Sequence, residues 1–286
     1  MSEGWTVLRV LEWTAERFAK EGFPSARLDA EVLLAETLGV ERIRLYVDYA
    51  KPLAQAELDA YRALVRRRLR AEPVAYLVGR REFWSLELTV APGVLVPRPE
   101  TELLVDLGAG WIARHDELPR PRVIDVGTGS GAVALALQVE CPQAEVLAIE
   151  LDGAAATIAR ENIRRGGDQV RLLRGDLLSA VATESVDLVL SNPPYITSAE
   201  FHELPKDVRA FEPLRALDGG DDGLDVIRRL VAQARRCLRP DGGLLFEIGY
   251  RQGEAAAALC EDAGLEQVSV YKDLAGLDRV VSATRR

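Results

Sequence analysis

Hydrophobic residues recur at helical spacing through the first 80 residues. A helix over residues 6–19 is predicted by apolar side chains that share one face, namely Val7, Val10, Leu11, Ala15 and Phe18. The same spacing predicts helices over residues 28–38, ended by Gly39, and over residues 55–70. The pattern therefore indicates a helical domain over residues 1–81.

Period-two alternation replaces the helical spacing between residues 82 and 97. Apolar and polar residues alternate there on either side of Pro92-Gly93, a pair typical of turns. This pattern predicts a β-hairpin with its turn at Pro92-Gly93. We assign residues 82–98 to a hairpin linker that joins the helical domain to the rest of the chain.

Strand-like and helical segments alternate from residue 122 onward. The strand-like runs are residues 122–126, 145–149, 170–173, 186–191 and 243–248, and helical candidates between them cover residues 132–140, 153–165 and 224–238. Such alternation is typical of βαβ units, which form a mostly parallel sheet with helices on both faces. Two last runs, 266–271 and 279–283, have no room for a helix between them and predict a terminal antiparallel hairpin. Residues 99–286 are thus predicted to form an α/β domain.

Composition narrows the class of protein. The chain is 48% hydrophobic and 28% charged, as is usual for a globular protein, and no run approaches the ~18 apolar residues of a membrane span. The charged start of the chain, with Glu3, Glu12 and Glu16, predicts neither a secretory leader nor a transit peptide, so we expect a cytoplasmic protein. The three cysteines are far apart and predict buried thiols, with no metal site.

Charge is distributed unevenly. Residues 1–85 hold 14 Lys and Arg against 13 Asp and Glu, whereas residues 86–286 hold 22 against 32. The acidic charge of the second domain argues against direct binding of nucleic acid as its function. The arginines Arg66, Arg67, Arg68 and Arg70 favour a solvated helix face, with a docking patch for an acidic partner as the alternative.

A glycine-rich loop follows the first strand of the α/β domain. The segment reads Asp125-Val-Gly-Thr-Gly-Ser-Gly131 and opens a helix, so its backbone can turn tightly and approach a ligand. We expect a cofactor to contact this loop at Gly127, Thr128, Gly129, Ser130 and Gly131. The spacing also fits the dinucleotide fingerprint, so the loop alone leaves NAD open.

Acidic residues follow the next two strands. Glu150 ends the second strand, where a carboxylate can accept hydrogen bonds from both ribose hydroxyls of a nucleoside, and Asp152 is the competing candidate. Asp176, between Gly175 and Leu177, comes after the third strand and is a candidate acceptor for an adenine amino group, although a Gly-Asp turn explains it equally well. These residues predict a ligand that contains adenosine.

The fourth strand runs directly into Asn192-Pro-Pro-Tyr195. A planar NH2 group is a poor nucleophile because its lone pair is delocalised, and two fixed acceptors can hold its hydrogens and aim the nitrogen. Asn192 supplies a side-chain oxygen and Pro193 a carbonyl, Pro193 and Pro194 stiffen the loop, and Tyr195 can stack on the planar group. A plain turn is the alternative. This combination of two acceptors and an aromatic ring favours methyl transfer from S-adenosylmethionine to nitrogen, with Asn192, Pro193 and Tyr195 as catalytic residues.

The chain resembles the release factor glutamine methyltransferases of the PrmC/HemK family over nearly its whole length. The motifs that carry the resemblance are Pro73-Val-Ala-Tyr76 with Gly79, Glu82-Phe83, Pro97-Arg-Pro-Glu-Thr-Glu102, Asp125–Gly131, Ser191-Asn-Pro-Pro-Tyr195, Phe211-Glu-Pro-Leu214 and Gly219-Gly-Asp-Asp-Gly-Leu224. The Asn-Pro-Pro-Tyr motif is shared with adenine-specific DNA methyltransferases and a ribosomal-protein glutamine methyltransferase. The helical domain together with Pro97–Glu102 is more specific.

The resemblance implies a class I methyltransferase fold, a mostly parallel seven-stranded sheet with a terminal antiparallel hairpin, behind a helical substrate-recognition domain. It implies transfer of a methyl group to the side-chain amide of the glutamine in the Gly-Gly-Gln motif of class I peptide chain release factors. Gly127–Gly131, Glu150, Asp176, Leu177 and Asn192 would bind S-adenosylmethionine, and Asn192–Tyr195 the glutamine, with no metal. Leu177 departs from the tryptophan that some members place against the adenine.

Three rival functions remain at this point: glutamine methylation of a ribosomal protein, adenine N6 methylation of nucleic acid, and a non-catalytic binding module. Pro97–Glu102 reads equally as a helix start and as a ligand contact, because Pro99 with Glu100 and Glu102 suits a first helical turn. Glu247 ends a strand that faces the site and is a further candidate for substrate contact.

Overall fold

A computed structural model of the chain describes residues 4–286, and internal contacts divide these residues into two units. One unit runs to Gly79 and includes the segment Pro205–Phe211, and the other comprises Arg80–Leu204 and Glu212–Arg286. The first three residues of the predicted helical domain, Glu3 among them, lie outside the described residues.

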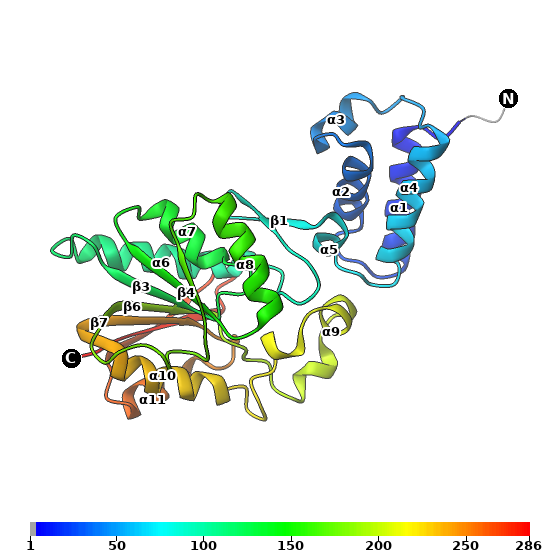
Figure 1. The fold of residues 1–286 in the computed structure, drawn as a ribbon. Coiled ribbons are helices and arrows are strands. Elements are labelled where there is room, and N and C mark those ends of the chain that lie inside the picture. The colour runs from blue at the N-terminus through cyan, green and yellow to red at the C-terminus, as the bar shows by residue number, and fades with distance from the viewer. Residues whose placement is uncertain (1–3) are drawn as a thin grey trace. The chain divides into compact units, whose positions relative to one another are not determined.

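The first unit is helical, as predicted. It contains α1 (Val7–Lys20), α2 (Ala26–Leu38), α3 (Arg42–Val47), α4 (Gln55–Arg68), α5 (Val74–Val78) and α9 (Lys206–Phe211) (Figure 1). The Thr6 side chain caps the start of α1, and Gly39 ends α2 in the left-handed conformation at φ 62°. The three longer helices α1, α2 and α4 confirm the sequence pattern, whereas α3, α5 and α9 are too short to show a hydrophobic period.

A buried cluster holds these helices together. Its members are mostly aliphatic, with Phe18 and Tyr61 among the largest fully buried side chains. The Tyr61 hydroxyl donates to the carbonyl of Ala30 at 3.1 Å. Arg68 is also buried, forms an ion pair with Asp29 at 2.9 Å, and lies over the ring of Phe23. The prediction of a solvated arginine face is therefore wrong for Arg68, whose charge is neutralised inside the unit.

The hairpin lies earlier in the chain than the alternation predicted. Its strands are β1 (Arg80–Phe83) and β2 (Leu86–Thr89), joined at Trp84 and Ser85, both of which have positive φ. Positive φ at both turn residues suits the twist of a two-residue hairpin loop. The Pro92-Gly93 segment turns but begins no strand. The alternation there reflects one-sided burial of unpaired extended chain, in which Val90, Val94 and Val96 are buried.

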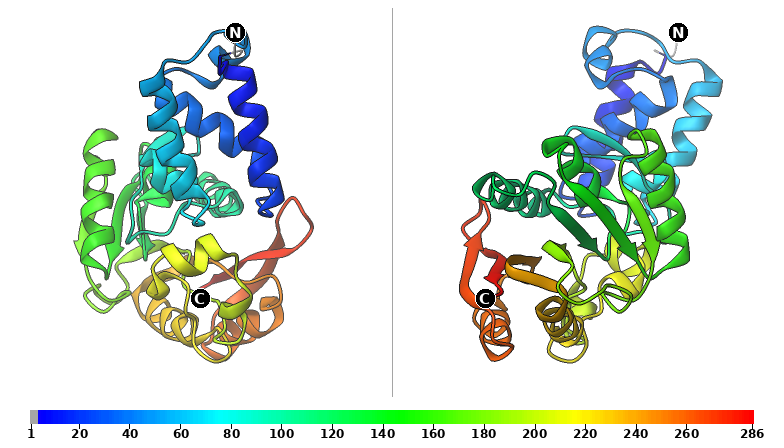
Figure 2. Two further views of the ribbon diagram at one scale, coloured as in Figure 1. Left: turned by 90° about the vertical axis from the view of Figure 1, so that its right-hand side faces the viewer. Right: turned by 60° about the vertical axis from the view of Figure 1, so that its left-hand side comes forward.

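The second unit is built on a seven-stranded sheet of order β5-β4-β3-β6-β7-β9-β8. The strands are β3 (Arg122–Val126), β4 (Glu145–Glu150), β5 (Arg171–Arg174), β6 (Val186–Ser191), β7 (Leu238–Glu247), β8 (Glu266–Lys272) and β9 (Asp278–Thr284). The first five pair in parallel, whereas β9 is antiparallel to both β7 and β8. This arrangement confirms the predicted mostly parallel sheet with a terminal antiparallel hairpin, seen in red and orange at one edge in Figure 2.

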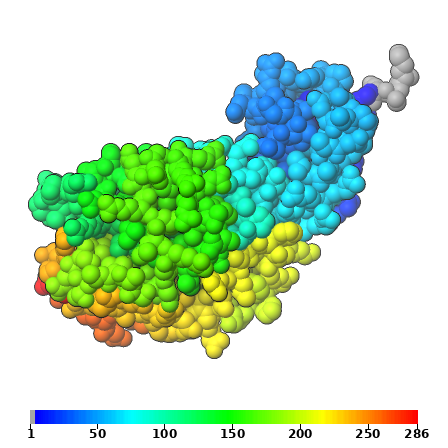
Figure 3. Space-filling view, viewed as in Figure 1, coloured from blue at the N-terminus to red at the C-terminus, as the bar shows by residue number. Residues whose placement is uncertain are grey.

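Helices cover both faces of this sheet (Figure 1). On one face pack α6 (Glu102–Arg114), α7 (Ala132–Glu140) and α8 (Gly153–Arg165), and on the other α10 (Asp225–Cys237) and α11 (Gly253–Asp262). Three 3-10 turns, Pro99–Thr101, Glu200–Glu203 and Leu214–Ala216, complete the unit. Side chains of the green segments, which include α7 and α8, form a continuous surface on the first face (Figure 3). Each face thus has its own apolar core, and the strand ends between them remain available for ligands.

Two composition-based expectations have a structural counterpart. The cysteines Cys141, Cys237 and Cys260 are all buried and unbridged, as the sequence predicted. No helix within residues 4–286 combines the length and the apolar character needed to cross a membrane.

Candidate active site

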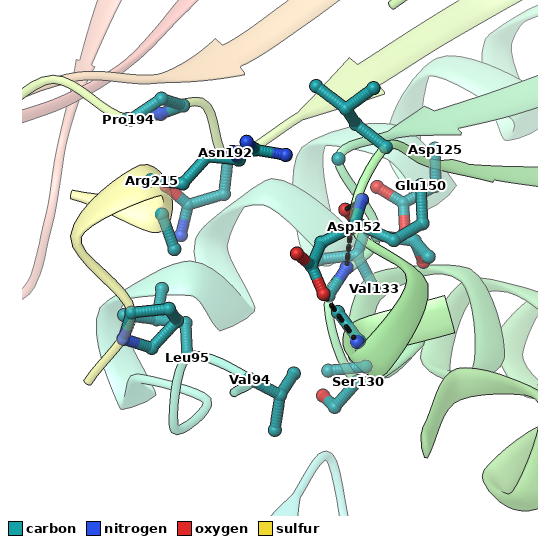
Figure 4. Close-up of a pocket in the computed structure, with 18 of the residues that line it drawn as sticks. Val94, Leu95, Asp125, Ser130, Val133, Glu150, Asp152, Asn192, Pro194 and Arg215 are labelled. Atoms are coloured by element: carbon teal, nitrogen blue, oxygen red, sulfur yellow. Dashed lines mark hydrogen bonds between the residues drawn. The ribbon is translucent and has the colours of Figure 1, made fainter. Parts of the chain in front are cut away.

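A pocket opens at the carboxyl ends of the central strands of the second unit. Figure 4 shows Asn192 and Pro194 to one side of it and Ser130 and Glu150 to the other. The lining includes residues from the glycine-rich loop, the ends of β4 and β5, the loop after β6 and the segment before α6. Parallel strands bring these ends to one edge of the sheet, which is where ligands bind in open α/β folds.

The glycine-rich loop is held by an unusual backbone conformation. Gly127, Gly129 and Gly131 have φ of 71°, 57° and 86°, a region that residues with a Cβ rarely adopt. The amides of Gly127 and Thr128 both donate to the carbonyl of Ile149, at 2.8 and 3.0 Å. The alternating glycines are therefore needed first for the conformation of the loop. They also leave bare backbone in the pocket lining at Gly127 and Gly129.

Asp125 fixes this loop from below. Its Oδ2 accepts from the Thr128 hydroxyl at 2.6 Å and from the amide of Ala134, in the first turn of α7, at 3.1 Å. The carboxyl is buried, and burial raises its pKa to about 6 against the pull of these two hydrogen bonds. Asp125 was not among the predicted site residues, although its place near the end of β3 was a usable signal.

The structure separates the roles of Glu150 and Asp152. The Glu150 carboxylate is buried, lines the pocket and accepts from the amides of Gly129 and Asp152, each at 2.8 Å. Asp152 instead accepts from the amides of Ala154 and Ala155 and caps α8. Because an ionised carboxylate has about four acceptor positions, Glu150 retains acceptor capacity toward the pocket, whereas the oxygen of Asp152 that faces α8 is already used.

Asp176 and Leu177 lie in the lining after β5. Asp176 is half-exposed and forms an ion pair with Arg229 at 2.5 Å, so its carboxylate is shared with a cation of α10. Leu177 has a φ of 48° and offers an apolar wall. Asp176 can therefore both belong to a Gly-Asp turn and contact a ligand in the pocket.

Asn162 supports the site from α8. Its side chain is buried, donates to the carbonyls of Thr89 and Ser130 at 3.0 and 2.9 Å, and accepts from the amide of Thr89 at 2.8 Å. One side chain therefore ties the hairpin strand β2 to the glycine-rich loop. No local sequence signal marked Asn162, because both partners are distant along the chain.

The Asn-Pro-Pro-Tyr loop begins where β6 ends. Asn192 and Pro194 line the pocket, Pro193 is buried beside them, and the ring of Tyr195 packs against the core beneath α10. The Tyr195 carbonyl accepts from the Gln252 side chain at 3.0 Å, and residue 196 pairs with residues 217–219 in a short parallel bridge. The loop is therefore fixed at both ends.

A buried chain of hydrogen bonds runs behind Asn192. Its Nδ2 donates to the Thr101 hydroxyl at 3.0 Å, and Thr101 donates to Oε2 of Glu247 at 2.6 Å. The Tyr195 hydroxyl donates to Oε1 of Glu247 at 3.1 Å. Burial raises the pKa of Glu247 and the pKa of Tyr195. Glu247 is not among the residues that line the pocket, and its hydrogen bonds place it behind Asn192.

The segment Pro97–Glu102 both starts a helix and contributes residues to the pocket. Pro99 opens the 3-10 turn that leads into α6, as a helix start requires. Pro97, Arg98 and Thr101 nevertheless line the pocket. Arg98 is anchored by an ion pair at 2.7 Å with the buried carboxylate of Glu212, part of the Phe211–Leu214 motif. The helix-start pattern alone does not predict that Pro97, Arg98 and Thr101 line the pocket.

Comparison with known proteins identifies the family. The model of the PrmC N-terminal domain matches residues 9–79, and that of the methyltransferase small domain matches residues 101–205. Two proteins named release factor glutamine methyltransferase, from Rhodopirellula baltica and Geobacter sulfurreducens, are 42% and 41% identical to this chain. The matches cover 97% and 98% of this chain and 96% of each relative. The chain belongs to the release factor glutamine methyltransferase family.

Solved structures show the same fold at lower identity. A methyltransferase from Pyrococcus furiosus matches with a TM-score of 0.52 and 19% identity, over 70% of this chain and 89% of that one. The hMettl16 catalytic domain, solved with an RNA hairpin, matches with a TM-score of 0.55 and 16% identity, over 71% and 77%. These likenesses concern the fold alone. Family and fold together make this chain an S-adenosylmethionine-dependent methyltransferase, which closes the NAD alternative.

The pocket suits that cofactor on its own geometry. Backbone of the glycine-rich loop can approach a ligand, the buried Glu150 retains acceptor capacity, and Val94, Leu177 and Ala155 supply apolar wall. Of the residues expected to bind it, Gly127, Thr128, Gly129, Ser130, Glu150, Asp176, Leu177 and Asn192 are in the lining, whereas Gly131, the N-cap residue of α7, is not. Within residues 4–286 no cluster of three or more His, Cys, Asp or Glu side chains is placed to hold a metal ion.

Proposed function

We propose that this methyltransferase transfers a methyl group to the side-chain amide nitrogen (N5) of the glutamine in the Gly-Gly-Gln motif of class I peptide chain release factors. The observation that carries the proposal is the position of Asn192 and Pro194, which line the cofactor pocket directly after β6. Relatives named for release factor glutamine methylation, alike over nearly the whole chain, support the choice of substrate.

The proposed roles follow the two sides of the pocket. Gly127–Gly131, Glu150, Asp176 and Leu177 would hold S-adenosylmethionine, with Asn192 at its methionine end. Asn192 Oδ1 and the Pro193 carbonyl would accept the two hydrogens of the glutamine amide, while Pro194 and Tyr195 shape the space around it. Fixing both hydrogens aims the nitrogen lone pair and removes rotational freedom before reaction.

When bound, S-adenosylmethionine supplies an electrophilic methyl group on a sulfonium centre. As the carbon–nitrogen bond forms, the sulfur–carbon bond breaks, and the proton released from nitrogen passes to water. The residues of this chain would hold the two reactants in position and surround them with a partly closed apolar pocket. These two effects account for most of the rate of a transfer that neutralises charge. No side chain of the site is needed as a covalent intermediate.

We further propose that the parts of the chain have the separate roles that the sequence predicts. Residues 1–81 would recognise the release factor, residues 82–98 would link the domains, and residues 99–286 would carry out the transfer. Because release factors act in bacterial translation, the protein would work in the cytoplasm. The net acidic second domain is consistent with a protein substrate in place of nucleic acid.

Intact-mass analysis tests the proposal. Purified, unmethylated release factor is incubated with this protein and S-adenosylmethionine, beside a release factor whose Gly-Gly-Gln glutamine is replaced. A gain of one methyl group by the first factor alone is the expected result. No gain, while a parallel titration shows that cofactor binds, would reject the release factor and direct the search to ribosomal proteins and then to nucleic acid.

A further inference from the structure

Asn192 is connected to a carboxylate that lies outside the pocket. The hydrogen bonds described above join the loop after β6 to Thr101, at the start of α6, and to Glu247, at the end of β7. Three segments separated by up to 146 residues therefore meet behind one side-chain amide. The Thr101 and Glu247 side chains are both buried.

The hydrogen-bonding capacities of these groups fix a direction. An ionised carboxylate only accepts, and the two oxygens of Glu247 take hydrogens from Thr101 and Tyr195. A hydroxyl has one hydrogen, so Thr101, having given it to Glu247, can only accept from Asn192. Asn192 must then present Nδ2 to Thr101, which leaves Oδ1 as the end of its amide that is available to the pocket.

The direction depends on a carboxylate without its proton. Burial favours the protonated form of Glu247, and the neighbouring Glu100 acts in the same sense. The Thr101 and Tyr195 hydroxyls and the positive charge of Arg279 oppose it. Arg279 is itself held in place by Asp273 at 3.1 Å and donates to the carbonyl of Ile248, next to Glu247. The site thus places a fixed cation near its buried acid.

We propose that Glu247 and Thr101 are positioning residues that determine which end of the Asn192 amide faces the pocket. The proposal rests on the proposed function, since it concerns how a substrate amide is held. With Oδ1 toward the pocket, Asn192 can accept a hydrogen from a planar NH2 group. With the amide reversed, Nδ2 would point its own hydrogens at that group, and the loop could not hold it.

The composition of the chain makes the orientation directly measurable. The sequence contains two asparagines, Asn162 and Asn192. Full-length protein labelled with 15N only in asparagine therefore gives two pairs of side-chain amide proton signals, one pair for each NH2 group, and loss of one pair in Asn192→Ala assigns them. Asn162, hydrogen-bonded to Thr89 and Ser130, is an internal reference. In wild type we expect an Asn192 amide proton that exchanges slowly with water.

Three variants test the direction. Thr101→Val removes the acceptor, and we expect exchange of the Asn192 amide proton to accelerate at least about tenfold, which is the factor for about 1.4 kcal/mol, with the Asn162 signals unchanged. Thr101→Ser keeps the hydroxyl and should keep the wild-type signals. Glu247→Gln turns one acceptor into a donor, so we expect the Asn192 signals to shift or double. If Thr101→Val does not fold, Glu247→Gln decides.

The same variants are assayed on release factor. A loss of position at the reacting group predicts a kcat about 100-fold lower in Thr101→Val, with little change in affinity for S-adenosylmethionine and with activity restored in Thr101→Ser. Asn192 signals that do not respond to Thr101→Val or Glu247→Gln overturn the proposal, as does an unchanged kcat. If wild type itself fails to methylate release factor, the proposed function fails, and the asparagine signals still decide the positioning role.

Discussion

The glycine-rich loop and the Asn-Pro-Pro-Tyr loop follow neighbouring strands, β3 and β6, but are held by different means. The first takes its shape from left-handed glycines and from backbone bonds to Ile149, and the side chains of Asp125, Glu150 and Asn162 fasten that shape. The second has no left-handed residue among residues 192–195 and depends on side chains from distant parts of the chain, namely Thr101, Glu247 and Gln252.

This difference matches what each loop must offer. A cofactor that lies along a backbone needs shape, and glycine conformation provides shape with few side-chain atoms in the way. A substrate amide needs acceptors of defined polarity, which backbone conformation alone does not set for a side chain such as Asn192. The comparison implies that changes in one loop should affect affinity and changes in the other should affect turnover.

The largest effect is expected from Asn192→Ala. Loss of the acceptor that aims the substrate nitrogen should lower the rate of methyl transfer by about 10²- to 10³-fold, by analogy with removal of an oxyanion-hole group. Because the glycine-rich loop and Glu150 are untouched, the dissociation constant for S-adenosylmethionine should stay within about tenfold. Initial rates by mass spectrometry and a calorimetric titration measure the two quantities. Unchanged turnover would contradict the role given to this loop.

Asp125→Asn tests how the first loop is anchored. The folded pKa of Asp125, about 6, lies above its ordinary value of 3.8, so protonation stabilises the folded state and this stability is lost as the pH rises from about 4 to about 6. Relative to the variant, which cannot titrate, wild type should lose about 3 kcal/mol of unfolding free energy across that window. Urea denaturation at matched ionic strength measures the difference. A constant difference between the two proteins would show that Asp125 does not titrate there.

The same comparison explains which parts the sequence could predict. Helices α7, α8 and α10 and the seven strands follow from local hydrophobic periods, whereas α11 was not predicted and α6 was indicated only by its start at Pro99. The glycine-rich and Asn-Pro-Pro-Tyr motifs are contiguous in the chain. Asn162 was not predicted, and neither were the hydrogen bonds that join Thr101 to Asn192 and Glu247, because these partners are 32 to 146 residues apart and no local pattern reports such contacts.

The errors have the same origin. The hairpin was misplaced because alternating burial over residues 90–96 resembles a paired strand, although no partner strand is present for it among residues 4–286. Arg68 was assigned to solvent because its ion pair with Asp29 joins α4 to α2, and the two residues are 39 positions apart in the sequence. A period in the sequence reports which face is buried, but not what lies against it.

Glu150→Gln should affect cofactor affinity and leave the second loop intact. A neutral amide cannot accept from Gly129, Asp152 and a ribose together, and loss of one charge-assisted hydrogen bond corresponds to about 1.5–3 kcal/mol. We expect the dissociation constant for S-adenosylmethionine to rise about 10- to 100-fold. At saturating cofactor, kcat should remain near that of wild type. A large fall in kcat at saturating cofactor would contradict the conclusion that the first loop affects affinity and only the second affects turnover.

Asp152→Ala is the matched control for Glu150→Gln, and we expect the smallest effect from it. The two carboxylates lie two residues apart and both line the pocket, but Asp152 caps α8 through the amides of Ala154 and Ala155. Loss of a helix cap lowers the free energy of unfolding by about 1 kcal/mol. Cofactor affinity should change little, since Glu150 keeps its own two amide donors when only the Asp152 side chain is removed. Thermal unfolding and the calorimetric titration test both parts. If affinity instead falls as far as in Glu150→Gln, Asp152 contacts the cofactor, and the assignment of the ribose to Glu150 alone is wrong.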